Sequence, residues 1–100
     1  MLENLVFLEL KRRGKEVYYH NRLKECDFVI KEKTKIVEAI QVSWSIEDES
    51  TYKRELAGLL DAVRTYGLNE GFILTESMDR EFEVEGVHVS VKPVWKWMLE

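Results

Sequence analysis

The sequence predicts a mixed α/β domain in which helices cover both faces of a mixed sheet. Two segments, 1–13 and 47–66, carry apolar residues at spacings of three and four, which is typical of helices. The remaining apolar runs are short and bounded by polar turns, which is typical of strands. Two of these runs, 27–30 and 36–42, lack a clean alternation of apolar and polar residues, so we expect both faces of their sheet to be covered.

The first half of the chain predicts one helix followed by three strands. The helix is expected over 1–13 and largely buried, because its apolar residues surround most of its circumference. Glu9 and Arg13 are spaced for an i,i+4 ion pair, and Gly14 ends the helix. The strands are expected over 16–20, 27–30 and 36–42 as an antiparallel meander.

The second half predicts a crossover helix, a parallel strand and a hairpin. Acidic residues 47–49 suit a helix start, and Gly67 suits the helix end. A strand over 71–75 then lies parallel to the strand before the helix, because a helix is the usual crossover between parallel strands. The hairpin is expected over 81–84 and 87–91, and residues 94–99 close the chain as a short helix or turn.

Composition fits a single domain spanning residues 1–100. The chain has 100 residues, of which 45% are hydrophobic, and no apolar run approaches the roughly 20 residues of a membrane helix. Its one cysteine, Cys26, excludes an internal disulfide and fits a reducing compartment. We therefore expect a cytoplasmic protein without a membrane partner, with Cys26 as a small core residue.

Positive charge gathers in the first third of the chain. Residues 1–35 carry nine Lys/Arg and six Asp/Glu, a net charge of +3, whereas the whole chain has a net charge of −4. The candidate nucleic-acid-binding residues are Lys11, Arg12, Arg13, Lys15, Arg22 and Lys24. The alternative is an ordinary solvated surface, because a negative net charge of the whole chain disfavours tight binding to phosphate groups.

Polar residues mark the ends of two neighbouring predicted strands. Gln41 and Ser43 are two apart and point the same way, and Asp27 can lie beside them on the next strand. Glu38 has the opposite parity to Gln41 and should face the other layer. The alternative is that Asp27 caps a turn while Gln41 and Ser43 are ordinary polar residues near a sheet end.

Aromatic residues and histidines give weaker signals. Trp44 is expected to pack over the strand end. Trp95 and Trp97 are expected to cover the core, with docking against another domain as the alternative, since tryptophan is favoured at interfaces. His20 and His88 lack the spacing of metal ligands.

The order helix, three strands, helix, strand resembles the core of the PD-(D/E)XK nuclease-like fold. The spacing of Glu3, Gly14, Asp27 and Gln41 resembles that of archaeal Holliday-junction resolvases. Segments 2–14, 25–29 and 95–97 resemble the opening helix, the Glu-Val-Asp-Phe-Val strand and the closing segment of a domain at the C-terminus of archaeal P-loop ATPases. This resemblance implies a restriction-endonuclease-like α-β-β-β-α-β core plus a C-terminal β-hairpin.

The resemblance also implies a site that has lost half of its charged groups. Glu3 and Asp27 match the first two ligands of the Mg²⁺ site of these nucleases. Gln41 stands where the family has a Glu, and Ser43 where it has a Lys. Losing one charged stabiliser typically lowers the rate by a factor of about 10²–10³, so the site formed by Glu3, Asp27, Gln41 and Ser43 is expected to be degenerate.

Two functions follow as expectations from this resemblance. The first is a non-catalytic nuclease-fold module that binds nucleic acid or a partner together with a P-loop ATPase domain in cis or in trans. The chain has no Gly-rich phosphate loop, so ATPase activity would come from elsewhere. The alternative is a Mg²⁺-dependent, resolvase-like endonuclease acting on structured DNA. The likeness to resolvases also implies a homodimer.

Overall fold

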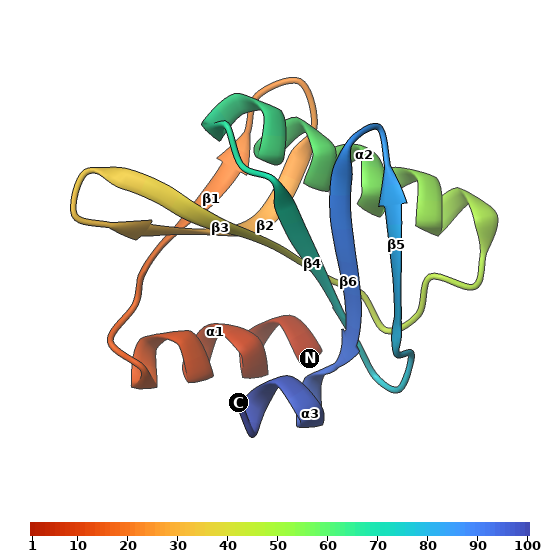
Figure 1. Ribbon diagram of the computed structural model, residues 1–100. Helices are drawn as coiled ribbons and strands as arrows, with labels where there is room; N and C mark the ends of the chain where they lie inside the picture. Colours follow the sequence, from red (N-terminus) through yellow and green to blue (C-terminus); the bar gives the residue numbers. More distant parts are fainter.

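One six-stranded mixed sheet forms the centre of the molecule, with strand order β1-β2-β3-β4-β6-β5 (Figure 1). The computed structural model describes residues 1–100. Its elements are α1 (Leu2–Arg12), β1 (Glu16–Asn21), β2 (Glu25–Glu32), β3 (Lys35–Val42), α2 (Glu49–Tyr66), β4 (Glu70–Thr75), β5 (Arg80–Val84), β6 (Val87–Pro93) and α3 (Val94–Met98). None of the helices is both long enough and apolar enough to cross a membrane.

Strand pairing follows the predicted connections. β1, β2 and β3 form an antiparallel meander, and β3 pairs in parallel with β4 across the α2 crossover. β4 also pairs in parallel with β6, to which β5 is antiparallel. The predicted elements are therefore confirmed in type and order, and their boundaries differ by a few residues at most.

Two hydrophobic cores lie on opposite faces of the sheet, so the prediction of helices on both faces is confirmed (Figure 1). Between α2 and the sheet the buried residues include Val29, Ala39, Leu59, Ile73 and Val89. Between the sheet and the pair α1 and α3 they include Val6, Leu10, Phe28, Ile40 and Trp97.

Helix α1 is less buried than its composition predicts. Only Val6, Glu9 and Leu10 are buried, whereas Leu5 and Leu8 are 42% and 55% exposed. α1 and α3 together form a single layer on the sheet (Figure 1), and nothing packs on the outer side of that layer. The expectation of a largely buried helix is therefore wrong, because one apolar stripe of α1 faces the core and a second does not.

An arginine connects the two ends of the chain. Arg13 forms the predicted ion pair with Glu9 at 2.7 Å, and its Nη2 donates to the Trp97 carbonyl at 3.0 Å. Its guanidinium also lies 4.5 Å from the centre of the Trp97 ring, a cation–π geometry. Hydrogen bonds from Arg12 and Arg13 lower the pKa of Glu9 to about 2.

The tryptophans divide between core and surface. Trp97 is buried, as predicted, but Trp95 and Trp44 are 62% and 66% exposed, so the expectations that Trp95 covers the core and that Trp44 packs over the strand end are wrong. Helix α3 has only five residues, and one-sided packing turns Val94 and Trp97 inward and leaves Trp95 outside.

Helix α2 approaches the sheet most closely at a glycine. A Cβ added to Gly58 would lie 1.8 Å from the Glu25 carbonyl oxygen and 2.5 Å from Gln41 Nε2. Both are closer than non-bonded atoms can come, and one of them belongs to the backbone. Gly58 is therefore required by this close approach rather than by an unusual backbone angle.

We predict that Gly58→Ala destabilises the fold by about 3 kcal/mol, the upper end of overpacking costs, despite the better helix propensity of alanine. Urea denaturation followed by circular dichroism measures this change. Lys53→Ala, on the exposed side of the same helix, is the control and should change the free energy of unfolding by less than about 0.5 kcal/mol. A Gly58→Ala protein that gains stability would contradict the close approach.

Candidate functional site

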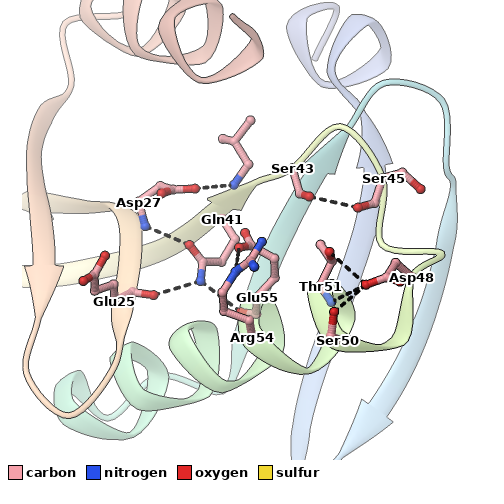
Figure 2. A network of polar contacts seen from close by, with 11 residues as sticks. Glu25, Asp27, Gln41, Ser43, Ser45, Asp48, Ser50, Thr51, Arg54 and Glu55 are labelled. Carbon is pink, nitrogen blue, oxygen red and sulfur yellow. Dashed lines mark hydrogen bonds and ion pairs between the residues drawn. The ribbon is translucent and has the colours of Figure 1, made fainter.

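Asp27 and Gln41 lie side by side in β2 and β3, as predicted (Figure 2). Gln41 Oε1 accepts a hydrogen bond from the Asp27 backbone N–H at 2.8 Å. In return, the Asp27 carboxylate accepts from the Val42 backbone N–H at 2.8 Å. Each side chain thus bonds to the backbone of the other strand, which fixes the two strands against one another at this end of the sheet.

The Gln41 side chain also reaches helix α2. Its Nε2 donates to the carbonyl oxygens of Glu25 at 3.0 Å and of Glu55 at 2.9 Å (Figure 2). Together with the bond to Asp27, these contacts form what we call the Gln41 bridge, and the residue is only 2% exposed. Both donors and the oxygen of the amide are engaged, so the side chain is held by three backbone groups, two from β2 and one from α2.

The expectation that Ser43 points the same way as Gln41 is wrong, because β3 ends at Val42 and Ser43 turns away into the following loop (Figure 2). Its Oγ donates to the Ser45 carbonyl at 2.9 Å, within the loop that leads to α2 (Figure 2). Glu38 is half-buried, and Ile40 and Val42, which have the same parity in β3, pack in the core beneath α1 and α3. The opposite parity predicted for Glu38 and Gln41 is therefore confirmed.

The surroundings of the Asp27 carboxyl group disfavour its negatively charged form. Burial raises its pKa to about 6, the Val42 N–H opposes this shift, and the nearby charges of Glu3, Glu55 and Glu25 add to it. Glu3 is exposed on the first turn of α1. The structure thus brings Glu3 and Asp27 within electrostatic reach of each other.

A magnesium site does not fit these residues. No set of three Asp, Glu, His or Cys side chains is close enough to hold a metal ion. No third acidic side chain joins Glu3 and Asp27 in a possible metal site, and the amide at Gln41 is neutral and already held by the backbone. Ser43 is uncharged and supplies no cation at this place.

A further carboxylate, Glu55, belongs to this region and was not predicted. Glu55 Oε1 is buried without a hydrogen-bond partner, and burial raises the pKa of the side chain. It lines a cavity of about 330 Å³ together with Asn21, Leu23, Lys24, Glu25, Asp27, Gln41 and Arg54. The spacing of residues in the helix could have predicted its position. Glu55 precedes the core residue Leu59 by one helical turn and therefore lies on the inward side of α2.

A buried histidine supports one wall of this cavity. His20 is 2% exposed, with its Nε2 2.9 Å from Asp61 Oδ2 and its Nδ1 3.0 Å from the Tyr66 hydroxyl. Asp61 also accepts the backbone N–H groups of Leu23 and Lys24. These hydrogen bonds lower the pKa of Asp61, and the one to His20 contributes most. The arrangement fastens the β1–β2 turn to α2 and is a structural clamp rather than a metal site.

The six candidate nucleic-acid-binding residues do not form one face. Lys11, Arg12, Arg13 and Lys15 surround the end of α1, whereas Arg22 and Lys24 lie in the turn at the far end of β1. A six-residue strand spans about 20 Å, which separates the two groups. In addition, Arg13 is engaged with Glu9 and Trp97, and Lys15 lies 3.6 Å from Glu32.

We predict that Asp27→Asn stabilises the protein at pH 8 by about 1–2 kcal/mol, a value reduced for partial solvent screening. The folded-state pKa of about 6 lies above the ordinary 3.8, so the charged form is the one that folding disfavours. The gain in stability of Asp27→Asn over wild type should therefore be largest above about pH 6, decrease as the pH falls, and vanish below about pH 4. Asparagine keeps an oxygen for the Val42 N–H.

Urea denaturation at pH 8 and pH 4 checks this prediction. Glu76→Gln, which removes an exposed carboxylate near the β4–β5 turn, is the control and should change stability by less than about 0.5 kcal/mol at both pH values. An Asp27→Asn protein that is less stable than wild type at pH 8 would show that the ionised carboxylate contributes favourable contacts.

Comparison with known proteins adds one relative. No family model matches the chain. The chain is 34% identical over 115 residues to the uncharacterized protein MJ1544 of Methanocaldococcus jannaschii, and the match covers 99% of this chain but 24% of the relative. The chain thus spans about a quarter of the length of this archaeal relative, and the functional argument depends on the fold and the site geometry.

Proposed function

We propose that this chain is a PD-(D/E)XK-type module that has lost its catalytic centre and functions by binding a partner, in association with a P-loop ATPase domain in cis or in trans. The element order supports this proposal, because one helix, three strands, a crossover helix, a fourth strand and a hairpin follow in the order of that core. The proximity of Asp27 and Gln41 at the end of β2 and β3 supports it further.

The Gln41 bridge is the observation that carries the non-catalytic reading. A metal ligand at this position would need an oxygen that faces open space and is free of other bonds. The residue instead has an amide whose oxygen and both donors are bonded to backbone groups of Asp27, Glu25 and Glu55. The same position cannot hold β2 to α2 through an amide and also present a carboxylate to a metal.

Charge favours a protein partner over nucleic acid. The chain has a net charge of −4, and its candidate cations are divided between two distant places. Tight phosphate binding depends on several cations acting together on one backbone. An ATPase domain is therefore a better candidate partner than DNA.

Glu55 is the observation that favours the alternative, a Mg²⁺-dependent endonuclease. It places a buried carboxylate oxygen without a partner in the cavity that Asp27 also lines. The two readings separate in a nicking assay on supercoiled and branched DNA with Mg²⁺ or Mn²⁺. We expect wild type and Asp27→Ala to show the same background level of DNA nicking. Cleavage that disappears in both Asp27→Ala and Glu55→Gln would establish the alternative.

We predict that Gln41→Glu, which restores the carboxylate, destabilises the fold by about 2–4 kcal/mol and does not create nuclease activity. The substitution removes both Nε2 donors and directs an oxygen at two carbonyl oxygens, which leaves buried polar groups unpaired. Thermal and urea denaturation with and without Mg²⁺ measure the effect.

The matched control is Asn69→Asp, which makes the same amide-to-acid change at an exposed position and should be close to neutral. If Gln41→Glu instead retained stability and Mg²⁺ raised its melting temperature, the amide would be a replaceable residue in a usable metal site. The proposed function would then be wrong.

A further inference from the structure

Tyr66, His20 and Asp61 form a continuous chain of hydrogen bonds between α2 and β1, which we call the tyrosine triad. The hydrogen bonds that lower the pKa of Asp61 keep its carboxylate ionised at neutral pH, so this carboxylate can only accept. In the neutral imidazole of His20 the proton is therefore on Nε2, which donates to Asp61. The other ring nitrogen, Nδ1, is then the acceptor for the Tyr66 hydroxyl.

The tyrosine triad has the geometry of an activated nucleophile. A hydroxyl that donates to an imidazole, which in turn donates to a carboxylate, combines a nucleophile, a base and a group that orients the base. The His20 ring is buried and meets the Tyr66 ring edge to face, with the ring centres 5.2 Å apart. Tyr66 itself is 37% exposed, so a reagent from solution can reach this residue although the base behind it is buried.

Tyr18 and Tyr19 are held in a way that suppresses their reactivity. They donate to the carboxylates of Glu16 and Glu25, and these hydrogen bonds raise the pKa of both phenols, that of Tyr19 to about 12. A carboxylate is a weaker base than an imidazole, and its charge opposes formation of the phenolate. The remaining tyrosine of the four packs against the core. Tyr66 therefore differs from the others in having a histidine as its acceptor.

A cavity with two arginines adjoins the tyrosine triad at Asp61. Its volume is about 320 Å³, and it is lined by Arg22, Leu23, Asp61, Arg64 and Thr65. The planar guanidinium group suits phosphate oxygens, to which it donates two parallel hydrogen bonds. The negative charge of Asp61 in the same wall is shared among three N–H donors. Arg64 also pairs with Glu85, but this ion pair is exposed and therefore weak. The cavity thus favours a phosphate group beside the triad.

We propose that Tyr66 is a phosphoryl acceptor, with His20 as its base and with the donor, a phosphoric or acyl-phosphoric anhydride, held by Arg22 and Arg64. The bond between Tyr66 Oη and phosphorus forms while the bond between phosphorus and the anhydride oxygen breaks. The leaving group departs with the electron pair as a phosphate or a carboxylate. His20 Nδ1 takes the phenol proton and later releases it to solvent, and Asp61 is a positioning residue that stabilises the imidazolium.

This inference does not rest on the proposed function, because the tyrosine triad uses neither the Asp27 carboxylate nor the Gln41 bridge. It also adds to the structural role of the same residues. The bonds that fasten the β1–β2 turn to α2 are the bonds that fix the tautomer of His20.

Labelling of the wild-type chain with N-acetylimidazole, followed by peptide mass spectrometry, compares the tyrosines within one molecule. Tyr18 and Tyr19 are 46% and 57% exposed, so exposure alone predicts that they react before Tyr66. The triad predicts the reverse order at pH 7, with Tyr66 faster by about tenfold or more. Between pH 7 and pH 9 the rates of Tyr18 and Tyr19 should rise about tenfold per pH unit, because they depend on the phenolate, whereas the rate of Tyr66 should change little.

Two variants test the base and the group that positions it. His20→Asn should lower the labelling rate of Tyr66 by about 10²-fold and leave that of Tyr18 unchanged. Asp61→Asn keeps an oxygen for the backbone N–H groups of the β1–β2 turn but no longer fixes the tautomer of His20. In this variant the labelling of Tyr66 should become as dependent on pH as that of Tyr18, which a purely structural role would not cause. Circular dichroism checks that each variant is folded.

Acetyl phosphate tests the chemical class of the donor, because this mixed anhydride can transfer either an acetyl or a phosphoryl group. We expect mass spectrometry to find a phosphoryl group on Tyr66 and none on Tyr18. Arg22→Ala should lower this transfer by about tenfold while labelling by N-acetylimidazole stays unchanged. Arg80→Ala, the same change at an exposed position in β5, is the matched control and should leave both reactions as in wild type.

Labelling of Tyr18 or Tyr19 ahead of Tyr66 in the wild-type chain would overturn the proposal, and this comparison needs no variant to fold. A folded His20→Asn protein in which Tyr66 reacts as fast as in wild type would overturn it as well. If acetyl phosphate left Tyr66 unmodified or gave it an acetyl group, the assignment to phosphoryl donors would be wrong. A nicking assay on DNA bears on the proposed function alone.

Discussion

The Gln41 bridge is the interaction on which the arrangement of this molecule depends. One amide joins the backbone of β2 to that of α2 while it lies at the end of β3, and the absence of a side chain at Gly58 lets the helix come close enough. Each hydrogen bond contributes only about 0.5–1.5 kcal/mol, but an unpaired buried partner costs more. The polar residue at this buried position is therefore a structural requirement. It also leaves this position without a charged group.

The fold could be predicted in outline because its signals are local. Spacings of three and four in α2, and the glycine after it, identify the helix and its end, and a helix between two apolar runs implies a parallel pair. The burial of α1 could not be predicted in the same way. A helical wheel shows that Leu5 and Leu8 are apolar, but only the positions of α3 and the sheet decide which stripe of α1 is covered. The same applies to Trp95, whose exposure follows from the shortness of α3.

The site could be predicted only where it depends on strand geometry. The proximity of Asp27 and Gln41 follows from two adjacent strands, so residue parity was sufficient. The bonds of Gln41 to the Glu55 carbonyl, and of His20 to Asp61 and Tyr66, join residues that are 14, 41 and 46 positions apart. They depend on how α2 crosses the sheet, which no local pattern encodes. The raised pKa of Asp27 likewise depends mainly on burial, a property of the assembled fold.

Because Cys26 is buried, the rate at which its thiol reacts reports how often the folded core opens. The residue is fully buried in the core beneath α2, and burial raises the pKa of the thiol to about 12. Alkylating reagents attack the thiolate, so the native molecule should be inert to them at neutral pH. Modification then requires the helix to leave the sheet, and the labelling rate of a single natural residue measures how often the whole core comes apart.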